Sequence, residues 1–284
     1  MNSNKKKYNE LILSGGGSNG VGILGALQYL YINHYLKNIK RFVGTSVGSL
    51  VSLLVIIGYE PNTIYEVMSN ISYEKLSELD TDKILLFFDT LGVMTGEKMI
   101  KLLTLFLNKK NISSEITFHK LYLLTQKEFV ITGYNLTKKK TVGFSYKTHP
   151  NMCVLKACRI SFSVPFIFRP VLYDQELYID GGFIENIPAR FCKNKEESLI
   201  LFIHRKNTKK QQIPTDVFDF AQVLFNQMYF NLDKSLMKKC KKYKNIIEIE
   251  VNNSSSQIIN FSMQKNEKEY LYNIGYNTTK KFFI

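Results

Sequence analysis

Apolar residues along this chain follow two patterns, short uninterrupted runs and longer stretches with an apolar residue every three or four positions. The runs at 9–13 and 41–43 predict buried strands, and the stretches after them, 21–35 and 49–54, predict helices. A strand, a turn and a helix recurring in this order are typical of a parallel sheet with crossover helices. The first part of the chain therefore predicts an α/β fold.

The same two patterns continue to the end of the chain. Helical spacing predicts helices at 64–79, 80–91, 97–107 and 260–283. Alternating or apolar runs predict a hairpin with a basic tip from 127–134 and 141–146, and short strands at 177–179, 199–203 and 246–251. Because no repeat or linker divides the chain, we expect a single domain over 1–284, with a core at about 9–190 and the segment 191–284 packed on it.

The segment Gly44-Thr45-Ser46-Val47-Gly48 lies between a predicted strand and a predicted helix. It has the G-x-S-x-G pattern of a nucleophile elbow, in which two glycines permit a turn that holds the serine out at the head of a helix. The N–H groups and the positive dipole end there favour an alkoxide or an oxyanion. Five loosely specified positions also recur by chance, so the pattern alone does not establish a catalytic serine.

A second glycine-rich segment, Gly15-Gly16-Gly17-Ser18-Asn19-Gly20, follows the first predicted strand and opens a helix. Such a loop can bind dinucleotide phosphates or an oxyanion. The dinucleotide hypothesis requires an acidic residue about twenty positions further on, at the end of the second strand. That region reads Asn33-His34-Tyr35-Leu36-Lys37 and contains no acid, which disfavours the dinucleotide hypothesis.

A carboxylate, Asp180, ends the predicted strand at 177–179 and is followed by Gly181 and Gly182. An Asp-Gly pair is more often only a turn. At the carboxyl end of a sheet strand, however, the side chain points into the crevice where ligands bind in open α/β sheets. Asp180 is therefore a candidate partner for Ser46.

Taken together and in this order, the segments 11–20, 44–48 and 180–182 resemble the patatin-like phospholipase family. The segments 116–121, 129–137, 161–171 and 186–188 add to the resemblance, which spans nearly the whole chain. It implies a three-layer α/β/α sandwich with a mostly parallel central sheet. It also implies a lipid acyl hydrolase of phospholipase A type.

The resemblance assigns roles to the residues of these motifs. Ser46 would be the nucleophile and Asp180 the general base, a dyad without histidine that passes through an acyl-serine intermediate. The amides of Gly15, Gly16, Gly17 and Val47 would form the oxyanion hole. The remaining motif positions are Gly20, Gly44, Gly48, Gly181 and Gly182. No metal or organic cofactor is required. The chain departs from the family at Asn19, where a basic residue is frequent, and at Ser163, where a small alanine is usual.

Two other hypotheses remain open. In an α/β-hydrolase the serine, the acid and a histidine follow one another along the chain, and His204 is the one histidine beyond Asp180. Alternatively, the protein is a catalytically silent, basic lipid-binding protein. A decayed enzyme would be expected to lose Ser46, Asp180 or the glycine loop, yet all three are present.

The charge composition indicates which kinds of partner the protein could bind. Its formal net charge is +14, and lysines cluster at 5–7, 138–140 and 238–244. An anionic bilayer attracts such residues by about 1 kcal/mol per charge. Because the chain carries no nucleic-acid motif, we expect a phospholipid or other acyl-lipid substrate and peripheral contact with an anionic membrane, and no nucleic-acid partner.

Two stretches without Asp, Glu, Lys or Arg, 11–36 and 42–59, are long enough to suggest membrane spans. They contain the glycine loop and the elbow, and buried strand–turn–helix units also lack charge, so we expect no transmembrane segment. The four cysteines are scattered, with no C-x-x-C pair, which favours reduced thiols and no zinc site. We expect a cytoplasmic protein that is not secreted.

Overall fold

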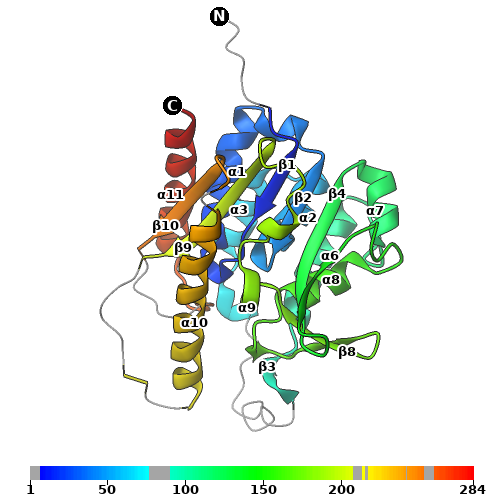
Figure 1. Ribbon diagram of the computed structural model, residues 1–284, viewed down its shortest axis with the longest axis vertical. Helices are drawn as coiled ribbons and strands as arrows, with labels where there is room; N and C mark the ends of the chain where they lie inside the picture. Colours follow the sequence, from blue (N-terminus) through cyan, green and yellow to red (C-terminus); the bar gives the residue numbers. More distant parts are fainter. Residues whose placement is uncertain (1–6, 77–89, 207–212, 215–216, 241, 253–258) are drawn as a thin grey trace, which may run out of the picture.

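The computed structural model describes residues 7–76, 90–206, 213–214, 217–240, 242–252 and 259–284 (Figure 1). The strands are β1 (Glu10–Leu13), β2 (Arg41–Thr45), β3 (Gly92–Met94), β4 (Glu128–Asn135), β5 (Lys140–Phe144), β6 (Phe166–Phe168), β7 (Val171–Tyr173), β8 (Glu176–Asp180), β9 (Ser198–Arg205) and β10 (Ile246–Val251). The α-helices are α1 (Val21–Ile32), α2 (Val47–Ile56), α3 (Pro61–Asn70), α6 (Glu97–Lys109), α7 (Phe118–Thr125), α8 (Val154–Ser161), α9 (Gly182–Glu185), α10 (Val217–Cys240) and α11 (Lys265–Phe283). Short 3-10 helices are η1 (Gly17–Gly20), η2 (Tyr35–Asn38), η3 (Tyr73–Leu76) and η4 (Ala189–Phe191).

The central sheet has the strand order β10-β9-β1-β2-β4-β8-β7, with β5 paired to β4. The strands from β10 to β4 are parallel, whereas β5, β8 and β7 continue the sheet in antiparallel pairs. Helices flank the sheet, as Figure 1 shows. The mixed α/β fold with a mostly parallel central sheet is confirmed. A separate two-stranded sheet joins β3 to β6.

The two faces of the sheet are buried against different helices, because successive side chains of a strand point to opposite sides. Leu11 and Leu13 of β1 belong to the larger core, formed with α1, α2, α8 and α11. Ile12, between them, packs with Val43 of β2 in a smaller core that includes the end of α10 near Cys240. Both faces are apolar, which explains why the strands read as uninterrupted apolar runs.

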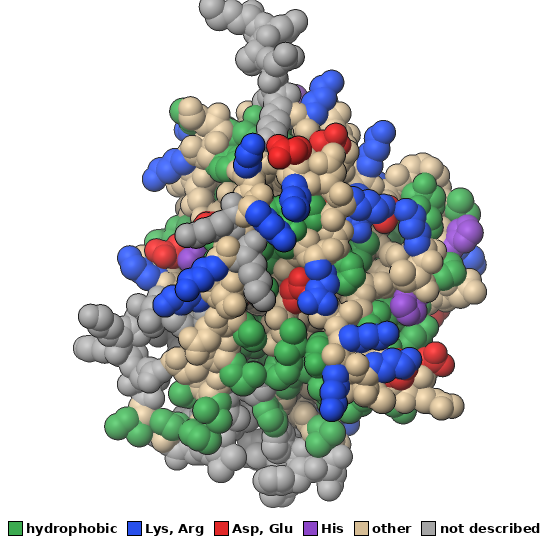
Figure 2. All heavy atoms as spheres, in the orientation of Figure 1, with side chains coloured by type: hydrophobic (Ala, Val, Ile, Leu, Met, Phe, Trp, Pro, Cys, Tyr) green, Lys and Arg blue, Asp and Glu red, His purple; other side chains and the backbone are tan. Residues whose placement is uncertain are grey.

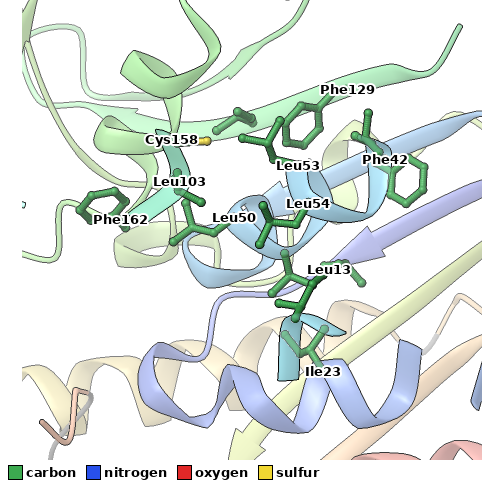
Figure 3. Packing of buried hydrophobic residues seen from close by; sticks show 14 of the residues in the cluster. Leu13, Ile23, Phe42, Leu50, Leu53, Leu54, Leu103, Phe129, Cys158 and Phe162 are labelled. Carbon is green, nitrogen blue, oxygen red and sulfur yellow. The ribbon is translucent and has the colours of Figure 1, made fainter. Parts of the chain in front are cut away.

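Helix α2 fills the centre of the larger core (Figure 3). Leu50 lies one turn before Leu53 and Leu54 on this helix, and the three pack with Phe42 of β2 and Phe129 of β4, all of them buried. Burying a side chain of this size contributes about 1.5–3 kcal/mol. The helix that follows Ser46 is therefore rigidly attached to the sheet.

The C-terminal helix α11 packs on α1 through glycines. A Cβ on Gly275 would lie 1.8 Å from the carbonyl oxygen of Gly22, so the two backbones are in direct contact. The predicted helix at 260–283 begins at Lys265, because the side chains of Gln264 and Glu267 form a capping box there. The C-terminal segment thus adds β9, β10 and α11 to the structure formed by the first half.

Other boundaries also differ from the sequence predictions. The helix predicted at 64–79 ends at Asn70 as α3, and Lys268 donates hydrogen bonds to the carbonyl oxygens of Met68 and Ile71 at that end. The helix predicted at 80–91 lies almost wholly outside the described residues. In the part of the chain that the structure describes, no helix is both long and apolar enough to cross a membrane.

Candidate active site

Ser46 lies at the junction of β2 and α2 in a strained backbone conformation, with φ 52° and ψ −128°. Few residues other than glycine adopt such a conformation outside functional sites. The turn can close because a Cβ on Gly48 would lie 2.4 Å from the carbonyl oxygen of Ser14, and one on Gly44 would also collide with the following helix. The Ser46 N–H donates to Ser161 Oγ at 2.9 Å. The elbow predicted from the sequence is present.

Asp180 ends β8 and lies beside Ser46. Its carboxylate accepts a hydrogen bond from the Gly182 N–H at 2.6 Å, and the Ser46 side chain is near enough to lower its pKa. Its own N–H donates to the carbonyl oxygen of Ser163 at 2.9 Å. The residue is 1% exposed, and this burial raises the pKa of Asp180 to about 7, although the two donors favour the charged form. Gly181 forms the N-terminal cap of the short helix α9.

The glycine loop follows β1 and faces the elbow. Gly17 has φ 54° and begins η1. Within the described part of the chain, the amides of Gly16, Gly17 and Val47 donate no hydrogen bond. We expected the Gly15 N–H to contribute to the oxyanion hole, but it already donates to the carbonyl oxygen of Asn186 at 3.1 Å. Gly15 therefore fixes the loop, and three of the four predicted amides remain available to an oxyanion.

The remaining motif glycine, Gly20, ends η1 and lies against the side chain of Val47. The two departures from the family pattern also have places in this structure. Asn19 is buried, and its N–H donates to the carbonyl oxygen of Gly16. Ser163 Oγ accepts a hydrogen bond from Arg159 and donates to that residue's carbonyl oxygen at 2.6 Å. The hydroxyl group is thus fully used within the loop that supports Asp180.

Helix α10 places the side chains of Asp233 and Tyr229 beside the site. Neither residue was predicted from the sequence. Asp233 Oδ1 accepts a hydrogen bond from Asn186 Nδ2 at 3.0 Å. Desolvation raises the pKa of Asp233 to about 7, against the effect of this hydrogen bond. Desolvation also raises the pKa of Tyr229, with further contributions from the charges of Asp180 and Asp233. The signal in the sequence was apolar spacing of four over 220–236, uninterrupted by glycine or proline.

An apolar cavity opens beside Ser46. Its lining includes Val47, Leu50 and Leu54 from one side of α2, and it continues between α3, α6 and β6. Phe106 of α6 and Phe168 of β6 are among the aromatic side chains that close it. Such a cavity favours a hydrocarbon chain over a charged group.

His204, the candidate for a triad, lies on β9 near its end. Its ring stacks on Phe202, with 4.8 Å between the centroids, and its Nε2 lies 3.9 Å from a carboxylate oxygen of Glu248. The structure therefore places His204 against β9 and β10, whereas the Ser46 side chain interacts with Asp180. This arrangement disfavours the triad hypothesis.

Fold and site together define a class of α/β proteins with an elbow serine, a buried aspartate and a glycine loop. The sequence matches the patatin-like phospholipase family over residues 11–192, and the chain belongs to that family.

Individual relatives come from viruses and a yeast. The chain is 36% identical over 208 residues, 72% of this chain and 68% of the relative, to "Probable lipid hydrolase 463L" of invertebrate iridescent virus 6. It is 29% identical, over 100% of this chain and 98% of the relative, to uncharacterized protein R571 of Acanthamoeba polyphaga mimivirus. It is 23% identical, over 68% of this chain and 12% of the relative, to lysophospholipase NTE1 of Meyerozyma guilliermondii.

Solved structures of bacterial proteins share the fold. VipD from Legionella pneumophila has a TM-score of 0.63 at 18% identity, over 98% of this chain and 67% of that chain. The type III effector ExoU of Pseudomonas aeruginosa has a TM-score of 0.54 at 16% identity, over 97% of this chain and 53% of that chain. At these identities the likeness concerns the fold alone.

Burial of Asp180 predicts a pH-dependent stability. The folded-state pKa of about 7 lies above the ordinary value of 3.8 for an aspartate, so folding favours the protonated carboxyl group. The free energy of unfolding, relative to that of a variant with an uncharged side chain at this position, is therefore highest below about pH 4. It falls by about 1.4 kcal/mol per pH unit from there to about pH 7. We expect Asp180→Asn to gain stability relative to wild type between pH 5 and pH 8, as measured by denaturant unfolding. Asp174→Asn, in the exposed β7–β8 turn, is the matched control. A difference in unfolding free energy between wild type and Asp180→Asn that is the same at pH 5 and pH 8 would contradict burial of the charge.

Proposed function

We propose that this protein is a lipid acyl hydrolase of phospholipase A type, which cleaves fatty-acyl esters of glycerophospholipids. Membership of the patatin-like phospholipase family supports a lipid ester hydrolase, as do relatives named lipid hydrolase and lysophospholipase. We also infer that the chain forms one domain, since β9 and β10 complete the sheet and α11 packs on α1.

The position of Ser46 in the lining of the apolar cavity carries the proposal. From Ser46 to Leu54 the helix advances eight residues, or about 12 Å at 1.5 Å per residue. An extended chain advances about 1.2 Å per bond, as a polypeptide backbone does. The stretch of cavity wall from Ser46 to Leu54 is therefore about as long as ten bonds of an extended acyl chain whose ester carbonyl lies at Ser46. The apolar lining would hold the chain, and the polar groups near Ser46 would face the ester.

In the acylation step, Ser46 Oγ attacks the carbonyl carbon of the ester while Asp180 accepts the hydroxyl proton. The pKa of about 7 makes Asp180 a stronger base than an ordinary aspartate and leaves much of it ionised near neutral pH. The amides of Gly16, Gly17 and Val47 would stabilise the negative oxygen of the tetrahedral intermediate. Collapse expels the lysophospholipid alkoxide, which takes the proton from Asp180.

In the deacylation step, water attacks the acyl group on Ser46. Asp180 accepts a proton from that water, and the second tetrahedral intermediate uses the same amides. Its collapse releases the fatty acid and returns the proton to Ser46. Each step needs one base and one set of donors, so the mechanism requires no histidine.

We further propose that the enzyme adsorbs to anionic membranes. Basic side chains are spread over the face in Figure 2, and hydrophobic ones gather toward its lower part. On α10, Phe220, Leu224 and Met228 are spaced by four residues and are 51%, 48% and 41% exposed. On an ideal helix this stripe lies roughly opposite Tyr229 and Asp233. One face of α10 would then contact lipid while the other adjoins Asp180.

Hydrolysis of mixed phospholipid vesicles tests the reaction. We expect wild-type protein to release free fatty acid and lysophospholipid, and Ser46→Ala to lower the rate at least ~10³-fold because the nucleophile is lost. His204→Ala is expected to retain most of the activity. The measurement is mass-spectrometric analysis of the lipid products. A loss for His204→Ala that approaches the loss for Ser46→Ala would favour a triad.

Vesicle sedimentation tests the membrane contact. We expect binding to need anionic lipid and to weaken between low and high salt, because screening shortens the reach of the lysines. Leu224→Asp should weaken binding without changing hydrolysis of a soluble short-chain ester. Leu124→Asp, at a 60% exposed leucine of α7, is the matched control. Binding that changes neither with salt concentration nor with the charge of the lipid would refute the electrostatic contribution.

A further inference from the structure

Helix α10 contacts the site through Asp233, and Asn186 transmits that contact. Asn186 follows α9 directly and is 5% exposed, so its side chain has a fixed place in the packing. Its Nδ2 donates to Asp233 Oδ1 at 3.0 Å. Figure 1 shows α10 passing close to α9.

Asn186 contacts both halves of the candidate site. Its carbonyl oxygen accepts the Gly15 N–H at 3.1 Å. Its Oδ1 lies close to two glycines, since a Cβ on Gly15 would approach it to 2.4 Å and one on Gly182 to 3.3 Å. Gly182 in turn donates its N–H to the carboxylate of Asp180. Asn186 thus separates the loop that carries the oxyanion donors from the loop that carries the base.

The acceptor at Asp233 decides the orientation of the Asn186 amide. The oxygen and nitrogen ends of an asparagine side chain are similar in size, so packing alone does not select between them. A carboxylate at Nδ2 binds the NH₂ end and leaves Oδ1 against Gly15 and Gly182. Without that acceptor the amide can rotate, and its NH₂ group would press on the glycines.

We propose that Asp233 is a positioning residue for acyl transfer. It holds Asn186 and, through Asn186, the spacing between the glycine-loop amides and the Ser46–Asp180 pair. Helix α10 is then part of the catalytic structure as well as a cover for the sheet. The proposal rests on the acyl hydrolase function proposed above. It assigns Asp233 no contact with the substrate.

Three variants of α10 test the proposal with a soluble short-chain p-nitrophenyl ester. Asp233→Leu removes the acceptor and is expected to lower kcat about 10²-fold, the effect of a 1 Å displacement in an active site, with KM nearly unchanged. Asp233→Asn keeps an acceptor oxygen and should restore most of kcat. Asn231→Leu, at an exposed position of the same helix, should behave as wild type. Asp233→Ser, too short to reach Asn186, replaces the leucine variant if that variant does not fold.

Hydrogen exchange supplies a readout that does not need turnover. In Asp233→Leu the amides of the peptide containing Gly15 should exchange faster than in wild type, whereas Asp233→Asn should leave them protected. Wild-type kcat and unchanged exchange in Asp233→Leu would overturn the proposal. So would an equal loss in the leucine and asparagine variants. Wild-type protein without Ser46-dependent turnover would refute the proposed function instead, and the exchange experiment would still decide whether Asp233 holds the loop.

Discussion

Burial of the Asp180 carboxyl group beside Ser46 is the constraint on which the site depends. Water would hold the pKa of an aspartate near 4, where it is a poor base for a serine hydroxyl group. In this structure the group is 1% exposed and its pKa rises to about 7. The Ser46 side chain and the Gly182 N–H lower the pKa of Asp180 and so keep the charged form accessible. Basicity near neutral pH thus comes from the packing around the end of β8.

The same packing explains why the backbone of Ser46 stays strained. Ser46 keeps a strained backbone because Gly48 touches the end of β1 and the helix after it is held in the core by Leu50, Leu53 and Leu54. Strain of this kind costs about 1–3 kcal/mol and persists only where the surroundings over-determine it. A rigid elbow and a buried base are therefore two results of one tightly packed α/β core.

The parallel strands, the crossover helices and the turn at Ser46 could be predicted from the sequence for a physical reason. Strands buried on both faces are apolar throughout, and the glycines of the elbow are required by contacts within a few residues along the chain or with the adjacent strand. Such local requirements leave short, readable patterns.

Other features depend on contacts between distant segments. The Gly15 amide is occupied by Asn186, a residue 171 positions away, so no local pattern could remove it from the predicted oxyanion donors. Asp233 lies on a helix whose regular apolar spacing is readable in the sequence, but its hydrogen bond with Asn186 depends on packing beside α9. The end of α3 likewise depends on Lys268 from the C-terminal helix.

The most direct test of the central claim, that Ser46 is a nucleophile activated by Asp180, is labelling with a fluorophosphonate followed by peptide mass spectrometry. The structure predicts one adduct, on the peptide that contains Ser46, at similar rates in wild type and His204→Ala. It predicts much slower labelling of Asp180→Asn and none of Ser46→Ala at that peptide. A wild-type protein that forms no adduct, or an adduct that survives Ser46→Ala, would contradict the claim.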